Sequence, residues 1–336
     1  MSEALGTLDA PVLVLADLDG TRPTDPALEL VAAARTLTGG GGDVVALTLG
    51  PVEAEASAAL AAAGANRLLV ADLGGERAQA AAGADAVVAA VHEVAPGAVL
   101  VSSDYRGKET AGRAAVLLDS ACVSDVADLR VVDGALHADR LVLSGSWSTT
   151  MSANAHTVPP PILAVRPGSV EVPDASVDDA APLPAVALEA AVSPEAAAVR
   201  LVSRESTAAA AGPDLAGART VVVGGRGVDG DFDLVRSLAE PLGAAVGATR
   251  VACDEEWIER SAQIGQTGVS IAPRLYIGLG VSGAIHHTSG IQGAGTIVAV
   301  CDDSEAPIFE MADFGVVGDV TEVVPQLVAE LDRLRG

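Results

Sequence analysis

Short apolar runs alternate with amphipathic stretches over the first hundred residues of the chain. The apolar runs are rich in Val and Leu and are bounded by Gly, Asp or Pro, which is typical of strands buried in a parallel sheet. Four such runs occupy residues 11–17, 43–50, 67–72 and 98–104. The intervening stretches at residues 26–37, 53–63 and 76–94 predict helices. This alternation predicts an α/β fold with a mostly parallel sheet flanked by helices.

The pattern changes after Asp119. Residues 128–145 carry Asp-Gly between two apolar runs, which predicts a β-hairpin. Residues 171–199, rich in Pro, Asp and Ala, predict an irregular connector. Strand-like runs then return at residues 219–224, 244–250, 274–280 and 296–303, before an amphipathic terminal helix at residues 319–336. We therefore predict three parts, an N-terminal α/β domain at 1–170, a connector at 171–202 and a second α/β domain at 203–336.

Charge and cysteine content narrow the class of protein. The 20 basic and 45 acidic residues give a formal net charge of −25, which argues against nucleic acid and anionic membrane partners. The three cysteines are far apart and have no metal-type spacing, so a reducing, cytoplasmic compartment fits best. We expect no signal peptide and no direct membrane insertion, because no segment has 18 or more strongly apolar residues.

Two glycine turns match the dinucleotide-binding fingerprint. They are Gly225-x-Gly227-x-x-Gly230 after TVVV and Gly278-x-Gly280-x-x-Gly283 after LYI. Glycine permits a tight turn and a close approach of the backbone to a pyrophosphate. Asp302 and Asp303 stand about twenty residues beyond the second turn, where a ribose-binding carboxylate belongs. Tight packing turns without a ligand would show the same glycines, so both interpretations stay open.

Polar groups gather around these turns. Residues 261–273 form a polar, glycine-rich segment without periodicity, as a surface loop would. His286 and His287 are adjacent on a predicted helix, so their side chains point to different helix faces and cannot easily bind one metal. One of them on the surface and the other with a satisfied partner is the simpler interpretation. We expect no metal site.

The order of several short motifs carries a family resemblance. GGRG, GATRVACD, QIGQTG, PRLYIGLGVSGAIHHTSG, TIVAVCDD, EAPIFEMADFGVVGD and VVPQL follow one another here. From about residue 203 onward the chain closely resembles the C-terminal FAD domain of electron transfer flavoprotein alpha subunits. The first 170 residues resemble the family's N-terminal domain more loosely, for example at SSDYRGKETAGRAAVLLDSACVSDV. The resemblance implies a Rossmann-like second domain that binds FAD without a covalent bond.

The same resemblance implies partners and a role. The chain would pair with an electron transfer flavoprotein beta subunit, whose own nucleotide in the family is AMP. The heterodimer would take single electrons from acyl-CoA or other flavin dehydrogenases, as in fatty acid β-oxidation, and deliver them to a membrane-linked quinone oxidoreductase. A bacterial cytoplasmic electron carrier, rather than an enzyme with a substrate pocket, is the implied class.

The resemblance also implies which residues bind the cofactor. These are Arg226, Thr249, Arg250, Gln263, Gly265, Gln266, Thr267, Gly268, Ser282, Gly283, His286, His287, Cys301 and Asp319. In the family the counterpart of Arg250 lies against the flavin ring, that of Thr267 bonds near flavin N5, and that of His287 faces flavin O2. Ser282 and Gly283 match the phosphate turn, Arg226 a cofactor-contacting arginine, and Asp319 an aspartate near the adenosine.

Three positions depart from the family pattern. His286 stands where glutamine is usual, and Cys301 stands where asparagine usually contacts the adenosine. The segment 144–158, expected as a loop, replaces one that normally carries Arg-Pro and paired glycines. Other interpretations therefore remain, namely an NAD(P)-binding oxidoreductase domain using Arg226 or Arg250 for a 2′-phosphate, a subunit without cofactor, or the alpha subunit of an electron-bifurcating flavoprotein.

Overall fold

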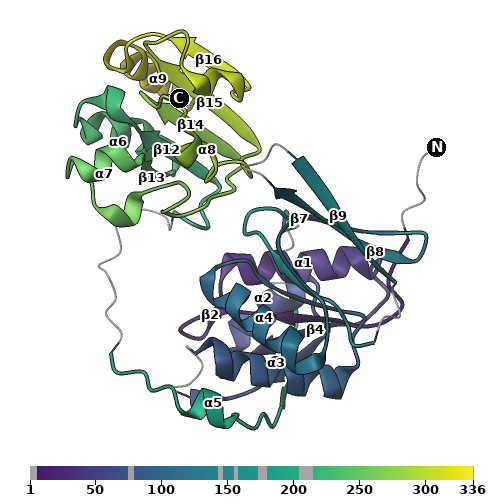
Figure 1. Cartoon of the computed structure of the whole chain (residues 1–336). Coiled ribbons are helices and arrows are strands. Elements are labelled where there is room, and N and C mark those ends of the chain that lie inside the picture. The colour runs from purple at the N-terminus through teal and green to yellow at the C-terminus, as the bar shows by residue number, and fades with distance from the viewer. Residues whose placement is uncertain are drawn as a thin grey trace. The chain divides into compact units, whose positions relative to one another are not determined.

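The computed structural model describes residues 6–74, 79–142, 147–154, 158–172, 180–203 and 215–335. These residues form two compact units, residues 6–203 and residues 215–335. Each unit is a sheet of mostly parallel strands with helices packed against it (Figure 1). The predicted fold class is therefore confirmed. No helix in these ranges combines the length and the apolar character that crossing a bilayer requires.

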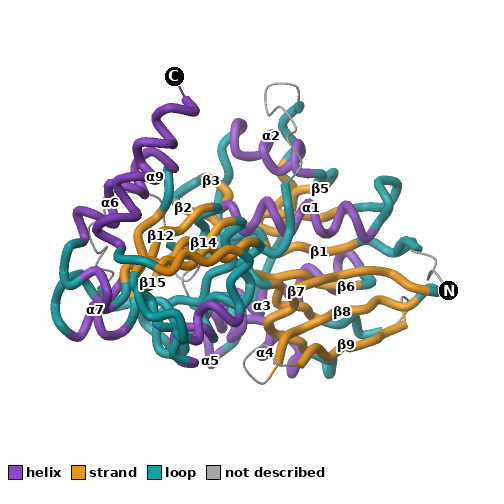
Figure 2. The backbone as a smooth tube through the Cα atoms, turned by 90° about the horizontal axis from the view of Figure 1, so that it is seen from above, coloured by secondary structure: helices purple, strands orange, loops and turns teal. Residues whose placement is uncertain are grey.

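The first unit is built around a nine-stranded sheet, in the order β11-β5-β4-β1-β6-β10-β7-β8-β9. Its strands are β1 Val12–Leu15, β4 Val44–Thr48, β5 Arg67–Val70, β6 Ala98–Ser102, β7 Cys122–Val132, β8 Ala135–Val142, β9 Trp147–Asn154, β10 Ile162–Val165 and β11 Ala185–Ala187. The strands from β11 to β7 pair in parallel. β7, β8 and β9 pair antiparallel and lie side by side at one edge (Figure 2).

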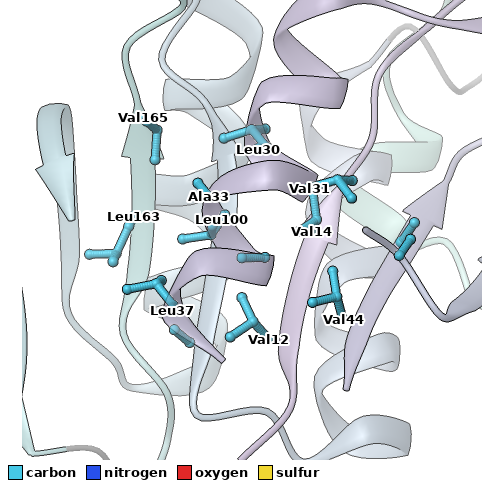
Figure 3. Close-up of a cluster of buried hydrophobic side chains, with 14 of the residues drawn as sticks. Val12, Val14, Leu30, Val31, Ala33, Leu37, Val44, Leu100, Leu163 and Val165 are labelled. Atoms are coloured by element: carbon cyan, nitrogen blue, oxygen red, sulfur yellow. The ribbon is translucent and has the colours of Figure 1, made fainter. Parts of the chain in front are cut away.

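Helices bury both faces of this sheet. They are α1 Asp25–Leu37, α2 Ala54–Ala63, α3 Ala80–Val94, α4 Tyr105–Leu118 and the short α5 Pro194–Ala197. Val12 and Val14 of β1 share one core with Leu30 of α1 (Figure 3), whereas Leu13 and Leu15 point into the core under α3 and α4. Side chains alternate between the faces of a strand, so β1 is apolar throughout because both of its faces are covered.

The first sheet changes its winding direction between β1 and β6. The chain runs from β1 to β4 and β5 on one side, and α3 then returns it to β6 on the other side of β1. Such a reversal leaves a crevice at the carboxyl ends of the two strands. Asp17 and the short antiparallel pair β2 Leu18–Asp19 and β3 Arg22–Pro23 follow β1 there, and Arg106 in the first turn of α4 follows β6.

The second unit is a five-stranded sheet in which every pair is parallel, in the order β13-β12-β14-β15-β16. The strands are β12 Thr220–Gly224, β13 Ala245–Ala248, β14 Leu275–Leu279, β15 Thr296–Cys301 and β16 Phe314–Val317. The winding reverses between β12 and β14. Numbered along the chain the order is 2-1-3-4-5, the flavodoxin-like variant of the doubly wound sheet. The parallel sheet flanked by helices is thus as expected, whereas the Rossmann-like detail is not confirmed, because the strand order is that of the flavodoxin-like variant.

The two faces of the second sheet are covered differently. The helices are α6 Phe232–Leu242, α7 Arg250–Asp254, α8 Ile285–Thr288 and α9 Val320–Arg335, with 3₁₀ turns η3 Arg226–Val228, η4 Arg260–Ala262 and η5 Pro307–Glu310. α6 and α9 supply most of the helical residues in one core. The other core contains Ile264 and Ile271 from the segment before β14, and Ile308 of η5. One face therefore carries long helices, and the other carries loops and single helical turns.

Most of the predicted elements are present. The hairpin predicted at 128–145 is confirmed over residues 128–142, with Asp133 and Gly134 in the left-handed region at φ 51° and 77° between β7 and β8. The expectation of a loop at 144–158 is wrong for residues 147–154, which form β9. Its Ser- and Thr-rich sequence is largely exposed, so no apolar alternation reveals the strand. Residues 143–146 and 155–157 of that segment lie outside the described part.

The expected connector at 171–202 contains more structure than its composition indicates. β11 extends the edge of the first sheet beside β5, and the backbone N–H of Ser193 donates to Asp85 on α3 over 2.7 Å. Residues up to about 203 therefore pack with the first unit. Residues 173–179 and 204–214 lie outside the described ranges.

Candidate functional site

The two glycine turns of the second unit pack against each other. The N–H of Gly227 donates to the carbonyl oxygen of Gly280 over 3.0 Å. A Cβ on Gly280 would lie 2.5 Å from the Cα of Gly227, and one on Gly225 would lie 2.3 Å from the oxygen of Gly280. Real Cβ atoms do not tolerate such distances, and Gly280 also has a positive φ of 62°. The packing interpretation therefore accounts for these three glycines without any ligand.

This contact lies at the winding reversal, between the carboxyl ends of β12 and β14. Gly227 and Arg226 are exposed there, and the side-chain donors of Arg226 face solvent, whereas the N–H of Gly227 is bonded to Gly280. Within the described residues the Arg226 guanidinium makes no hydrogen bond or ion pair, which leaves its donors available. Gly225, Gly227 and Gly280 thus form a glycine-lined edge, and a larger side chain at any of them would fill the space between the two turns.

The turn after β14 continues this edge. Gly283 has a φ of 85°, and a Cβ on it would lie 2.3 Å from the backbone nitrogen of Ile308. That nitrogen donates to the carbonyl oxygen of Ser282 over 3.1 Å, which ties the turn to η5. The side chain of Ser282 is exposed. The helix that follows, α8, has only four residues and is shorter than the sequence pattern indicates.

Arg250 and Thr249 follow β13, the edge strand beside β12. The Arg250 side chain is 65% exposed, and its Nε donates to Oδ2 of Asp254 over 3.1 Å. The hydroxyl oxygen of Thr249 is buried and has no hydrogen-bond partner among the described residues. A buried hydroxyl without a partner costs about 1–3 kcal/mol, so a ligand that bonds to it would be stabilised there.

The segment from Gln263 to Gly268 is held by internal hydrogen bonds. Gln263 is 2% exposed, and its Nε2 donates to the hydroxyl oxygen of Thr267 over 3.0 Å. Gly265 adopts a φ of 138° and leaves no room for a Cβ beside the carbonyl of His286. The side chains of Gln266 and Thr267 are exposed. The loop therefore presents two polar side chains from a rigid backbone.

The adjacent histidines have opposite environments. His286 is exposed, and its Nδ1 lies 2.7 Å from Oε1 of Gln266, whose backbone N–H donates to the His286 carbonyl over 2.7 Å. His287 is 5% exposed and uses both ring nitrogens inside the unit. Its Nδ1 lies 3.1 Å from the carbonyl oxygen of Ile264, and its Nε2 lies 2.8 Å from the hydroxyl of Tyr276. This matches the interpretation that one histidine lies on the surface and that the other is buried with its hydrogen bonds made inside the unit.

The chemistry of these partners fixes the tautomer of His287. A carbonyl oxygen only accepts, so Nδ1–H donates to Ile264, and Nε2 then accepts from the Tyr276 O–H. Burial lowers the pKa of His287 to about 4, and the bond to the Ile264 carbonyl offsets this in part. Burial also raises the pKa of Tyr276. A bond from His287 to a bound ligand would require one of these two contacts to be given up.

The remaining predicted site residues lie further along the same edge. Cys301 ends β15 and is 6% exposed, with its Sγ 3.9 Å from Oδ1 of Asp302. Asp302 and Asp303 are exposed. Asp319 follows β16 and accepts from the backbone N–H and the hydroxyl of Thr321, which lower the pKa of its carboxyl. Because all five strands are parallel, Arg226, Thr249, Ser282, Cys301 and Asp319 lie at the carboxyl ends of the sheet. The 263–268 loop joins that edge through the N–H of Ile264, which donates to the carbonyl of Ala248 at the end of β13.

Four groups of this site were not found from the sequence. Asp254 and Arg260 form a charged pair beside Arg250, and Tyr276 and the Ile264 carbonyl hold His287. The i,i+4 spacing of Arg250 and Asp254 is the one available signal, because such pairs meet on a helix. In the sequence, Tyr276 looks like any apolar core residue of a strand, so nothing marks it as a partner of His287. The part of the chain that the structure describes contains no cluster of ligands for a metal ion.

The carboxyl edge of the first sheet carries an ion pair beside a small hollow. A small hollow of about 70 Å³ there is lined by Ala16, Asp17, Leu18, Asp19, Gly20, Leu49 and Arg106. Arg106 Nη2 lies 2.5 Å from Oδ1 of Asp17. Burial raises the pKa of Asp17 to about 6, although the Arg106 charge lowers it in part. The charges at this edge are thus compensated within the unit.

The second unit combines a doubly wound parallel sheet, glycine turns at its winding reversal, and exposed donors along the same edge. The buried, unpartnered Thr249 hydroxyl and the glycine-lined edge fit a large ligand bound by hydrogen bonds, as a dinucleotide cofactor is. These features define a protein of the nucleotide-cofactor-binding class.

Comparison with known proteins identifies the family. Residues 214–292 match the family described as the electron transfer flavoprotein FAD-binding domain, and residues 12–193 match the electron transfer flavoprotein domain. The chain is 39% identical to the electron transfer flavoprotein subunit alpha of Mycobacterium leprae, covering 92% of this chain and 94% of that protein. It is 38% identical to that of Mycobacterium tuberculosis H37Rv, over 97% and 100% of the two chains, and 33% identical to that of Bacillus subtilis 168, over 96% and 98%.

The chain therefore belongs to the electron transfer flavoprotein family and is similar over its whole length to alpha subunits. The family match makes the second unit an FAD-binding domain, which confirms the expected cofactor.

Proposed function

We propose that this chain is the alpha subunit of a heterodimer that carries single electrons on FAD from flavin dehydrogenases to a membrane-linked quinone oxidoreductase. The beta subunit would hold AMP, and the heterodimer would work in the cytoplasm. Two findings support the proposal, the match to the FAD-binding domain and the similarity to alpha subunits along the full chain. The single structural observation that carries it is the exposed Arg250 guanidinium on the glycine-lined edge.

Arg250 suits a site that accepts electrons. When bound, FAD supplies a flavin ring that takes up electrons and gives them back, so its negative charge rises on reduction. Arginine is permanently charged and its planar guanidinium stacks well on rings. Asp254 holds Nε of Arg250, so the two terminal nitrogens stay available toward a ligand. The cation would therefore favour the reduced state of the cofactor.

Other residues would bind and orient the cofactor. We propose that Thr249, Arg226 and Ser282 offer donors to its polar groups, as the resemblance implies. The exposed Thr267 hydroxyl and the Gln266–His286 pair lie on the segments that follow β13 and β14 and would meet the same ligand.

His287 takes a different part in this proposal. Both of its ring nitrogens already bond to Ile264 and Tyr276. We propose that it fastens the 263–268 loop to β14 and α8, and that the imidazole offered to the ligand is that of His286.

The first test is the visible absorbance of the chain purified with its beta subunit. We expect bound oxidised flavin, and we expect an acyl-CoA dehydrogenase with its substrate to bleach it. Addition of a quinone oxidoreductase and quinone should restore the colour. A complex that stays colourless with added FAD would contradict the proposal. Reduction by a nicotinamide nucleotide without any dehydrogenase would favour an NAD(P)-linked or bifurcating role instead.

A further inference from the structure

A chain of hydrogen bonds links Asp254, Arg260, Gln263 and Thr267 and ends at the predicted cofactor edge. Oδ1 of Asp254 accepts from Nη2 of Arg260 over 2.6 Å. Nη1 of Arg260 donates to Oε1 of Gln263 over 3.3 Å, and Nε2 of Gln263 donates to Oγ1 of Thr267 over 3.0 Å. Gln263 is buried, whereas Asp254, Arg260 and Thr267 are exposed.

The chemistry of arginine determines the direction of every bond in this chain. A guanidinium has donors only, so the amide atom of Gln263 that faces Arg260 must be its oxygen. The amide nitrogen then faces Thr267 and can only donate, so the hydroxyl oxygen of Thr267 accepts. A hydroxyl has one proton. The Thr267 proton is therefore not used toward Gln263 and is available for a ligand.

Without Arg260 this direction would not be fixed. The two ends of a glutamine amide have nearly the same shape, so the side chain of Gln263 could turn its oxygen toward Thr267. Thr267 would then donate inward and present only lone pairs to the ligand. Arg260 thus selects between a threonine that donates to the ligand and one that does not.

We propose that Arg260 is a positioning residue that acts through Gln263 to keep the Thr267 hydroxyl as a hydrogen-bond donor toward FAD. Asp254 anchors it and holds Arg250 with its other carboxylate oxygen, so one carboxylate orients two cations of the site. Gln263, which the resemblance places among the cofactor contacts, is internal to this chain of bonds. The inference rests on the proposed placement of Thr267 at the cofactor.

The binding test is a double-mutant cycle on the full chain with its beta subunit. We expect Arg260→Met to weaken FAD binding about fivefold, as the loss of one donor would. In a Thr267→Val background the same change should have less than about a twofold effect, because the coupling partner is gone. Arg260→Lys should restore binding, since lysine also has only donors.

Arg236→Met is the matched control. Arg236 is an exposed arginine of the same unit that pairs with Asp233 on α6, so its loss changes the charge equally. It should leave FAD binding unchanged. An equal effect of Arg260→Met in both backgrounds would mean that the charge acts through space and would overturn the inference. No effect in the wild-type background would overturn it too.

A second measurement works without FAD. The chain has five glutamines, so selective ¹⁵N-glutamine labelling gives a simple set of side-chain amide signals. We expect Arg260→Met and Thr267→Val each to shift the Gln263 amide signals of the cofactor-free chain, whereas Arg236→Met should not. Unchanged signals in Arg260→Met would overturn the inference. Wild-type protein that binds no FAD would instead contradict the proposed function. The amide signals would still show whether Arg260 acts on the Gln263 amide, because they are measured without FAD.

Discussion

The carboxyl edges of the two sheets share one geometry but carry different groups. Each sheet reverses its winding and leaves a crevice between two parallel strands. In the first unit a half-buried carboxylate and an arginine form an ion pair that lines a hollow of about 70 Å³. In the second unit glycine backbones meet in the crevice, and a guanidinium, hydroxyls and an imidazole face outward. A shared architecture therefore does not by itself define a cofactor site, and the two edges differ in which polar side chains stay exposed.

The glycine contact should be the feature whose loss damages the second edge most. Gly280→Ala places a Cβ against Gly227 and forces an unfavourable φ, so we expect a loss of about 4 kcal/mol in the free energy of unfolding. Gly243→Ala is the matched control, because Gly243 has a similar φ of 59° but open space around its Cβ. It should cost about 1 kcal/mol.

Urea denaturation followed by fluorescence measures both variants. In a Trp147→Phe background the remaining tryptophan, Trp257, reports on the second unit alone. Equal losses for the two variants would show that the contact between the turns contributes nothing beyond the backbone conformation.

Lowering the pH should stabilise the first unit against unfolding and destabilise the second. Asp17 has a folded pKa of about 6 against 3.8 unfolded, so the folded first unit binds the extra proton and its stability falls as pH rises from about 4 to 6. His287 has a folded pKa of about 4 against 6.5 unfolded, so the stability of the second unit rises with pH over about 4 to 6.5. Each effect amounts to about 3 kcal/mol across its window.

Hydrogen exchange resolved by peptide across this pH range separates the units. Asp17→Asn should remove the slope of the first unit only, and His287→Gln that of the second unit only. Slopes of the same sign in both wild-type units would refute the contrast.

The charge at the second edge should appear in the redox potential. Arg250→Met removes a cation from the proposed flavin contact, and we expect the potential of the first electron to fall by on the order of 100 mV, about 2 kcal/mol. Potentiometric titration of the FAD-loaded heterodimer measures this, with Arg236→Met as the charge-matched control. A potential unchanged from wild type, with FAD still bound, would remove Arg250 from this role.

The buried partner of His287 should give the smallest effect. Tyr276→Phe leaves Nε2 of His287 buried without a donor, so we expect a loss of about 1–2 kcal/mol in the second unit. Tyr105→Phe, at a tyrosine that is 89% exposed, should change stability by less than about 0.5 kcal/mol. Thermal unfolding of both variants makes the comparison. A neutral Tyr276→Phe would mean that the histidine finds another partner.

The sequence predicts the regular elements far better than the contacts among the proposed site residues. Buried strands such as 98–104 are recognisable because both of their faces are apolar. β9 is not recognisable, because its hydroxyl-rich residues are largely exposed and show no apolar alternation, although it pairs with the preceding strand β8. The proposed site residues come from the family resemblance and stay a prediction, and the parallel strands bring those that follow β12 to β16 to the carboxyl ends of one sheet. The hydrogen bonds of Gln263 and His287 could not be predicted, because they depend on how the loops fold over the sheet.

The contact between Gly227 and Gly280 also limits how this domain can be redesigned. The turn after β12 and the turn after β14 are far apart in sequence, yet their backbones touch. A change of backbone shape in one turn therefore demands a compensating change in the other. Grafting a single cofactor-binding loop from another flavoprotein would fail here, whereas exchanging the two turns together would preserve their fit.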